Sequence, residues 1–147
     1  MGVKELLDKI MNDKENVILT ICGPLRNLNS MDRYCAYYTI MGNTILMPIN
    51  YSCIKKEVCT FEGADEYHKQ FRERSHNTKI DLSDAIIVVC GSDCYIGEDT
   101  MREICYAYET KKQILFTSIM AEEKEKFYFN HNLNFPLYIL KENDKWL

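Results

Sequence analysis

The side chains best placed for chemistry lie between positions 93 and 103. Asp93 follows closely on a predicted buried strand, and Gly97 gives the chain a flexible joint. Asp99 and Thr100 open a predicted helix, whose first N–H groups can bind an anion or be capped. Glu103 follows one turn into this helix, near its positive end, so we expect its carboxylate to be ionised at neutral pH. An ionised carboxylate suits a nucleophile better than a general acid.

Glu103 has two competing explanations. Helical spacing places Thr100, Glu103 and Ala107 on one stripe beside the apolar face, so Glu103 can point into a crevice where the small Ala107 leaves room. The segment 100–103 (TMRE) also matches a capping box, in which Thr100 bonds forward and Glu103 bonds back to close the helix end. The sequence leaves both explanations open.

The turn after the first predicted strand holds a second candidate site. Gly23 permits close approach of the backbone, and Arg26, two residues after Pro24, can bond a phosphate or carboxylate through its forked guanidinium. The alternative is an ordinary strand-ending turn with a solvated arginine. Tyr95, in the loop before the helix, either stacks on a base or covers the edge of the core.

The histidines and cysteines give no sign of a metal site. His68, His76 and His131 stand in polar or charged surroundings, and we expect each of them at the surface or in a loop. The cysteines form no C-x-x-C pair and have no zinc-type spacing to histidine. We therefore expect reduced, mostly buried thiols, no metal and no cofactor.

The hydrophobic pattern predicts the elements that position these residues. Predicted helices are 3–11, 31–41 (capped by Asn29 or Ser30 and ended by Gly42), 64–78, 100–111 and 120–129. Predicted strands are 17–22, 44–49, 85–90, 113–117 and a short edge strand at 137–140, with a loop or irregular lid at 50–63. Alternating strands and helices require a parallel α/β sheet covered on both faces. Ligands bind such sheets beyond the carboxyl ends of the strands, where the strand order switches.

Composition limits the partners. The 147 residues, 46% of them hydrophobic, fit a single domain over 1–147. A net charge of −4 lacks the basic excess that nucleic-acid binding requires, so no nucleic-acid partner is expected. The charged N-terminal segment 1–16 has no apolar stretch of the signal-peptide or membrane-helix kind. We expect a cytoplasmic protein that does not associate with a membrane.

Four segments together resemble the nucleoside 2-deoxyribosyltransferase-like superfamily, which includes 2'-deoxynucleoside 5'-monophosphate N-glycosidases. They are 21–26 (ICGPLR), 79–89 (KIDLSDAIIVV), 95–107 (YIGEDTMREICYA) and 112–116 (KQILF). Their order and spacing agree with the family across about 17–117. The resemblance implies a three-layer flavodoxin-like or Rossmann-like sheet and cleavage of an N-glycosidic bond.

The resemblance also implies roles for residues. The family's catalytic glutamate, in a Glu-x-x-x-Ala pattern, falls on Glu103 with Ala107, and its loop aspartate, which helps to hold the sugar or base, falls on Asp93. Its first-turn glycine falls on Gly23, near the sugar or phosphate. The chain departs from many relatives by carrying Asp99 at the helix start, where it would repel a 5'-phosphate unless Arg26 and Arg102 compensate. Relatives often build the site at a subunit boundary, so a homodimer or larger homo-oligomer is expected.

The leading hypothesis is cleavage or transfer at the N-glycosidic bond of a nucleoside or nucleotide. In this reaction Glu103 attacks the anomeric carbon, Asp93 fixes the sugar or protonates the leaving base, and the 50–63 segment closes over the site. The alternative is a non-catalytic nucleotide-binding or nucleotide-sensing domain, in which Glu103 merely closes the helix. The predicted catalytic residues are Glu103 and Asp93, and the predicted substrate-binding residues are Gly23, Pro24, Arg26, Tyr95, Gly97, Asp99 and Thr100.

Overall fold

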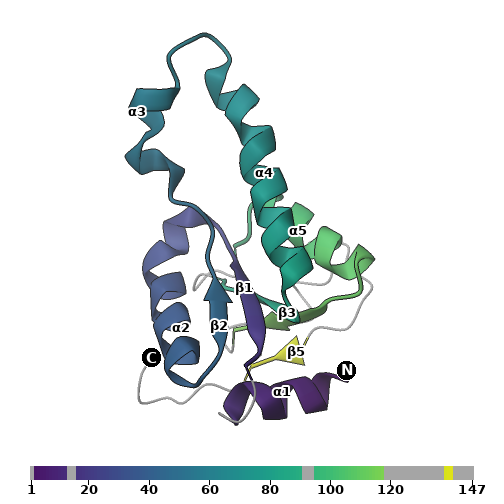
Figure 1. The fold of residues 1–147 in the computed structure, drawn as a ribbon. Helices are drawn as coiled ribbons and strands as arrows, with labels where there is room; N and C mark the ends of the chain where they lie inside the picture. Colours follow the sequence, from purple (N-terminus) through teal and green to yellow (C-terminus); the bar gives the residue numbers. More distant parts are fainter. Residues whose placement is uncertain (1, 13–15, 91–94, 118–137, 141–147) are drawn as a thin grey trace.

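Five parallel strands form the central sheet of the chain (Figure 1). The computed structural model describes residues 2–12, 16–90, 95–117 and 138–140. The strands are β1 (Ile18–Cys22), β2 (Thr44–Leu46), β3 (Ala85–Val88), β4 (Gln113–Phe116) and β5 (Tyr138–Ile139). They lie in the order β2-β1-β3-β4-β5, and every adjacent pair is parallel. The predicted parallel α/β sheet is confirmed.

Helices cover both faces of the sheet. The α-helices are α1 (Val3–Met11), α2 (Leu28–Ile40), α3 (Lys55–Val58), α4 (Ala64–Leu82) and α5 (Glu98–Glu109), with 3-10 turns η1 (Leu25–Asn27) and η2 (Tyr51–Cys53). Side chains of α1 and α2 share one buried cluster, and side chains of α4 and α5 share the other. This is the three-layer, flavodoxin-like arrangement that the resemblance implied. Figure 1 shows α3 and the first turns of α4 standing beyond the edge of the sheet.

Alternation along the strands divides the core between these two faces. On β3, Ala85 and Ile87 belong to the cluster of α1 and α2, whereas Ile86 and Val88 belong to the cluster of α4 and α5. On β1, Ile21 packs toward α1 and α2, and its neighbour Cys22 packs toward α4 and α5. Cys22 is therefore at the carboxyl end of β1, on the face covered by α4 and α5.

Several element boundaries differ from the predictions. The second strand ends at Leu46, well short of 49, because Pro48 lacks the N–H that a strand ladder needs. The fourth helix continues past 78 to Leu82. Gly42 has a φ of 99° and ends α2 in the left-handed conformation, as predicted. The 50–63 segment contains η2 and α3 within its irregular course.

Two predicted helix starts are wrong. The second helix begins at Leu28, directly after η1, so neither Asn29 nor Ser30 caps it. The fifth begins at Glu98, with Gly97 at its N-cap, two residues before the predicted start at Thr100. The remaining strands agree with the predictions to within two residues. The predicted helix 120–129 lies outside the described residues.

The thiols are less buried than predicted. None of the six described cysteines forms a disulfide, and Cys22 and Cys90 are buried. Cys53 and Cys105 are exposed, while Cys35 and Cys59 are intermediate. The expectation of mostly buried thiols is wrong, because Cys53 and Cys105 lie on exposed parts of η2 and α5 and Cys35 and Cys59 are only partly covered. Among the described helices, none is both long and apolar enough to cross a bilayer.

Candidate active site

A cleft of about 870 Å³ opens beyond the carboxyl ends of β1 and β3. The chain leaves β1 for β2 on one side and later returns to β3 on the other, so the strand order switches between β1 and β3. The turn after β1 and the described part of the loop before α5 both contribute residues to the cleft wall. The site therefore lies where ligands bind in open parallel sheets.

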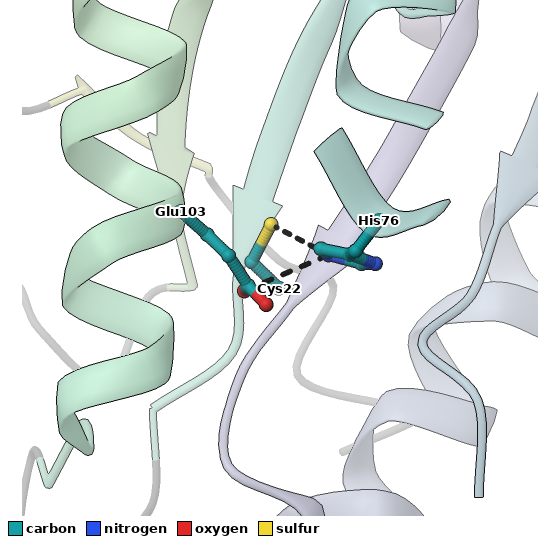
Figure 2. A group of neighbouring side chains, drawn as sticks. All are labelled: Cys22, His76 and Glu103. Carbon is teal, nitrogen blue, oxygen red and sulfur yellow. Dashed lines mark hydrogen bonds and ion pairs between the residues drawn. The ribbon is translucent and has the colours of Figure 1, made fainter. Parts of the chain in front are cut away.

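Three side chains from different elements converge at the base of this cleft (Figure 2). Cys22 comes from the end of β1, His76 from α4 and Glu103 from α5. The Sγ of Cys22 lies 3.4 Å from the Nε2 of His76, and the same nitrogen lies 3.6 Å from a carboxylate oxygen of Glu103. We call these three residues the polar triad.

Glu103 does not close its own helix. Thr100 is the third residue of α5, fully inside the helix and buried, so the capping box that would begin at Thr100 is absent. Thr100, Glu103 and Ala107 share one stripe, with Thr100 and Ala107 buried against the core. The Glu103 side chain is 13% exposed and lines the cleft. Of the two explanations that the sequence left open, the crevice-facing orientation is confirmed.

Burial controls the charge of Glu103. It raises the pKa of this carboxyl from 4.5 to about 7, against a hydrogen bond from Cys22 and the charge of Arg102, which both lower it. The charges of Asp99 and Glu73 raise it slightly further. The expectation that Glu103 is ionised at neutral pH is wrong, because burial raises its pKa to about 7. Glu103 lies beyond the first turn of α5, where the effect of the helix dipole is weak.

His76 and Cys22 are both uncharged. His76 is 6% exposed, and burial, assisted by the charges of Lys79 and Arg102, lowers its pKa to about 4. Its contact with Glu103 at neutral pH is therefore a dipolar contact and not an ion pair. Burial and the neighbouring Glu103 raise the pKa of the Cys22 thiol, so Cys22 holds its proton and is a poor nucleophile. The expectation that His76 lies at the surface is wrong.

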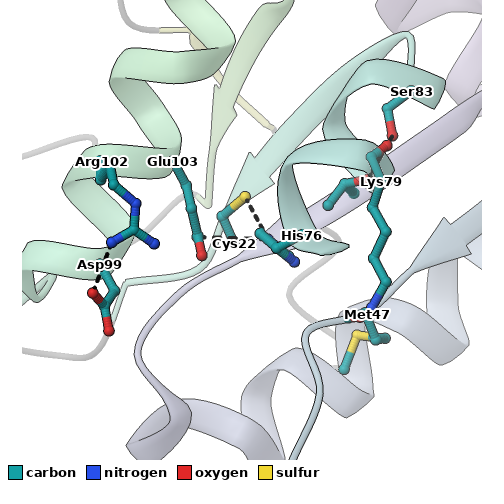
Figure 3. Close-up of polar contacts among 9 residues, drawn as sticks. Cys22, Met47, His76, Lys79, Ser83, Asp99, Arg102 and Glu103 are labelled. Carbon is teal, nitrogen blue, oxygen red and sulfur yellow. Dashed lines mark hydrogen bonds and ion pairs between the residues drawn. The ribbon is translucent and has the colours of Figure 1, made fainter. Parts of the chain in front are cut away.

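Charged side chains at the mouth of the cleft neutralise one another. Arg102 Nη1 lies 3.0 Å from Asp99 Oδ1 (Figure 3). The same nitrogen lies 2.8 Å from Glu73 Oε1. Lys69 Nζ lies 3.8 Å from the same Asp99 oxygen. The negative charge of Asp99 is thus offset by two cations, one of which is the predicted Arg102.

Lys79 reaches the other side of the cleft. Its Nζ donates a hydrogen bond of 2.7 Å to the carbonyl oxygen of Met47, as Figure 3 shows. Burial lowers the pKa of Lys79. Its backbone carbonyl accepts hydrogen bonds from Thr20 and Ser83, which fixes the end of α4 against β1. Lys79 therefore connects the segment after β2 to the base of the site.

The 50–63 segment supplies one wall of the cleft. The guanidinium carbon of Arg72 lies 4.0 Å from the ring centroid of Tyr51, a cation–π contact that holds η2 against α4. Lys55 Nζ lies 3.8 Å from an oxygen of Asp65, which links α3 to the start of α4. Tyr51 and Lys55 both line the cleft.

Close packing explains the glycine at position 23, in the turn after β1. A Cβ at position 23 would lie 2.8 Å from the backbone oxygen of Val89 and 3.2 Å from the Sδ of Met31. Gly23 thus lets the end of β1 approach the end of β3. Arg26 does not line the cleft; its guanidinium carbon lies 3.7 Å from the ring centroid of Tyr95, which does.

Most predicted site residues meet in the cleft. Those that line it are Gly23, Pro24, Tyr95, Gly97, Asp99, Thr100 and Glu103. Asp93 lies outside the described residues. The sequence missed Cys22, His76 and Lys79; for His76, the spacing of four residues to the buried Ile80 was a usable signal. No known family model and no curated protein matches the chain.

Proposed function

We propose that the chain cleaves or transfers the N-glycosidic bond of a nucleoside or nucleotide, with Glu103 as the nucleophile. The observation that carries the proposal is the Glu103 side chain lining a cleft at the switch point of a parallel sheet. The volume of about 870 Å³ falls in the range of roughly 300–1,000 Å³ typical of small-molecule sites. The resemblance across 21–26, 79–89 and 95–107 supports the same class of reaction.

The proposed reaction has two steps. A carboxylate oxygen of Glu103 bonds to the anomeric carbon as the bond from that carbon to the base nitrogen breaks, through an oxocarbenium-like transition state. The bonding electrons leave with the base, which takes up a proton; Asp93 is our candidate donor. Water then attacks the glycosyl ester and releases the sugar with Glu103 restored, or a second base attacks and completes transfer.

The polar triad suits this role for Glu103. A carboxyl whose pKa is about 7 is partly ionised at neutral pH and is more basic than an ordinary carboxylate. The Cys22 thiol donates to the carboxylate and the neutral His76 borders it, so the side chain is held in one orientation. A held nucleophile loses little further freedom in the transition state.

The cleft mouth offers contacts for the base and sugar. Tyr95 is 45% exposed and lines the cleft, and Arg26 covers part of its ring, which leaves an aromatic edge beside the site. Since Arg102 and Lys69 offset Asp99, the acidic helix start is a smaller obstacle to a 5'-phosphate than the sequence alone indicates. The proposal therefore includes both nucleosides and nucleotides.

The competing hypothesis, a non-catalytic nucleotide-binding domain, loses its main support. It depended on Glu103 closing the start of α5, and Gly97 occupies the N-cap there instead. It keeps one testable difference from the enzyme, since ligand binding without release of a base would favour it.

The test is release of free base from a panel of ribo- and deoxyribonucleosides and their 5'-monophosphates, followed by chromatography. Glu103→Gln should lower the rate by at least about 10³-fold, because it removes the nucleophile while keeping the side-chain shape. Glu109→Gln makes the same change at an exposed position at the end of α5 and should leave the rate unchanged. Equal rates in the two variants would remove Glu103 from the mechanism, and calorimetric binding without base release would support the competing hypothesis.

A further inference from the structure

The polar triad has the spacing of a metal site. Cys22 Sγ, a ring nitrogen of His76 and a carboxylate oxygen of Glu103 all lie within 4.8 Å of one another. The sulfur lies 3.4 Å from the nitrogen, and the nitrogen lies 3.6 Å from the oxygen. A tetrahedral zinc ion, with bonds of about 2.0–2.3 Å, keeps its ligand atoms roughly 3.3–3.6 Å apart. Both separations thus match what a zinc ion imposes.

The donor atoms select the kind of metal. Magnesium and calcium take oxygen ligands, whereas thiolate and imidazole suit zinc and other late first-row transition metals. One sulfur, one nitrogen and one oxygen form a mixed set that zinc accepts in full. Zinc sites with three protein ligands keep a fourth position for water or substrate. His76 and Glu103 both line the cleft, so the cleft side is available for that fourth ligand.

The charges also balance. A bound Cys22 thiolate and Glu103 carboxylate would together cancel the two positive charges of the ion, and His76 would remain a neutral ligand. Two cations act on His76: Arg102 on α5 is already paired with Glu73 and Asp99, and Lys79 on α4 donates its Nζ–H to the Met47 carbonyl. Burial of the three side chains excludes the water that would otherwise compete for them, while the cleft gives the ion a path to enter.

We propose that Cys22, His76 and Glu103 bind one zinc ion, with the fourth ligand supplied from the cleft. The metal site does not depend on the proposed function, because it stands on the three donor atoms alone. Its consequence for catalysis does rest on that function: a Glu103 oxygen bonded to zinc cannot attack an anomeric carbon, so zinc inhibits base release.

Cobalt substitution tests the site directly. The full chain, kept reduced and stripped of metal with EDTA that is then removed, is titrated with Co²⁺. We expect one equivalent to produce sulfur-to-cobalt charge transfer in the near ultraviolet and the intense visible bands of four-coordinate cobalt, both abolished by Zn²⁺. Cys22→Ser should lose the charge-transfer band, and His76→Gln and Glu103→Gln should each weaken binding at least tenfold, about the loss caused by removing even an outer-shell partner.

Matched controls separate this site from other thiols and imidazoles. Cys90→Ser changes another buried cysteine of the same cluster, and His68→Gln changes another histidine of α4. The double variant Cys53→Ser/Cys105→Ser removes the two thiols that are exposed among the described residues, which are open to adventitious cobalt. All three control proteins should keep the full band at one equivalent.

Two results would overturn the proposal: no charge-transfer band at one equivalent, or a band that survives in Cys22→Ser and is unweakened in His76→Gln. If Cys22→Ser does not fold, as judged by circular dichroism, the other two variants decide the matter. Cobalt binding, combined with no base release by the metal-free protein from any nucleoside or 5'-monophosphate, would reject the proposed function and keep the metal site. Base release from a protein that binds no cobalt would keep the proposed function and reject the metal site.

Discussion

The two faces of the sheet bury different kinds of side chain. Toward α1 and α2 the buried cluster is aliphatic and aromatic, and the polar Asn43 there donates to the carbonyls of Ile10 and Tyr38. Toward α4 and α5, hydroxyl, thiol, imidazole and carboxyl groups are buried beside the apolar cluster; they belong to Thr20, Ser83, Thr100, Cys22, His76 and Glu103. The face covered by α1 and α2 thus contributes mainly to stability. The face covered by α4 and α5 buries polar groups beside the cleft, which costs stability.

The largest expected effect comes from the apolar face. Ile21→Ala should lower the free energy of unfolding by about 2–5 kcal/mol, since Ile21 is fully buried and its loss leaves a cavity. The rate of base release per folded molecule should not change, because Ile21 points away from the cleft side of β1. Urea unfolding and an assay at low temperature measure the two quantities. Cys22→Ala, at the next position on the opposite face, is the matched variant and should cost less stability because it removes one atom. Lost turnover in folded Ile21→Ala protein would contradict this division between the faces.

The next largest effect is a gain in stability, expected for a substitution of Glu103. The pKa of Glu103 is about 7 in the folded chain and 4.5 ordinarily, so its contribution to stability is complete below pH 4.5 and is lost as the pH rises through 7. Glu103→Gln avoids this loss and should be more stable than the parent chain by about 2–3 kcal/mol at pH 8, with little difference at pH 4. Urea unfolding at both pH values measures it. A variant less stable than the parent at pH 8 would show that the carboxylate is stabilising where it lies.

Local patterns were enough to predict the sheet and the position of Glu103. Short β-branched runs such as 85–90 are strands in any context that buries both faces, and the stripe of Thr100, Glu103 and Ala107 depends only on helical geometry. Both features are set by residues within a few positions of one another. The predictions of the sheet and of the Glu103 position are therefore correct even though several predicted element boundaries are wrong.

The rest of the triad depends on long-range packing. Alternation places Cys22 opposite Ile21 on β1, yet which helices cover each face follows from the strand order, which the sequence does not reveal. The sequence predicts a surface position for His76 because its neighbours are charged. It also predicts an end of α4 at 78, four residues before the observed end at Leu82. The charge of Glu103 was mispredicted because burial by distant elements outweighs the local helix dipole.

His76 and Glu103 should affect the pH dependence of the free energy of unfolding in opposite directions, so that each effect masks the other in the parent chain. His76 has a pKa of about 4 against 6.5 ordinarily, so its contribution to stability is complete above pH 6.5 and is lost as the pH falls through 4. In His76→Gln only the Glu103 contribution remains, and stability should fall by about 1 kcal/mol per pH unit as the pH rises from 4.5 to 7. In Glu103→Gln stability should instead rise with pH between 4 and 6.5.

Unfolding measured across this range, with the double variant as the baseline for all other groups, checks both slopes. In the parent chain the two slopes oppose each other and largely cancel between pH 4.5 and 6.5. Parallel slopes in the two single variants would mean that one of the two groups is solvated in the folded chain.

The smallest expected effect is a shift in the pH dependence of catalysis. In metal-free protein, with EDTA present, kcat/KM for base release should fall below a midpoint of about pH 7, because only ionised Glu103 attacks. Arg102 favours that ionised form, and it also offsets Glu73 and Asp99, both of which disfavour it. Arg102→Gln should therefore move the midpoint to higher pH, by a modest amount because the guanidinium is partly solvated. A midpoint that is unchanged or lower in Arg102→Gln would mean that the Arg102 charge does not favour the ionised form of Glu103.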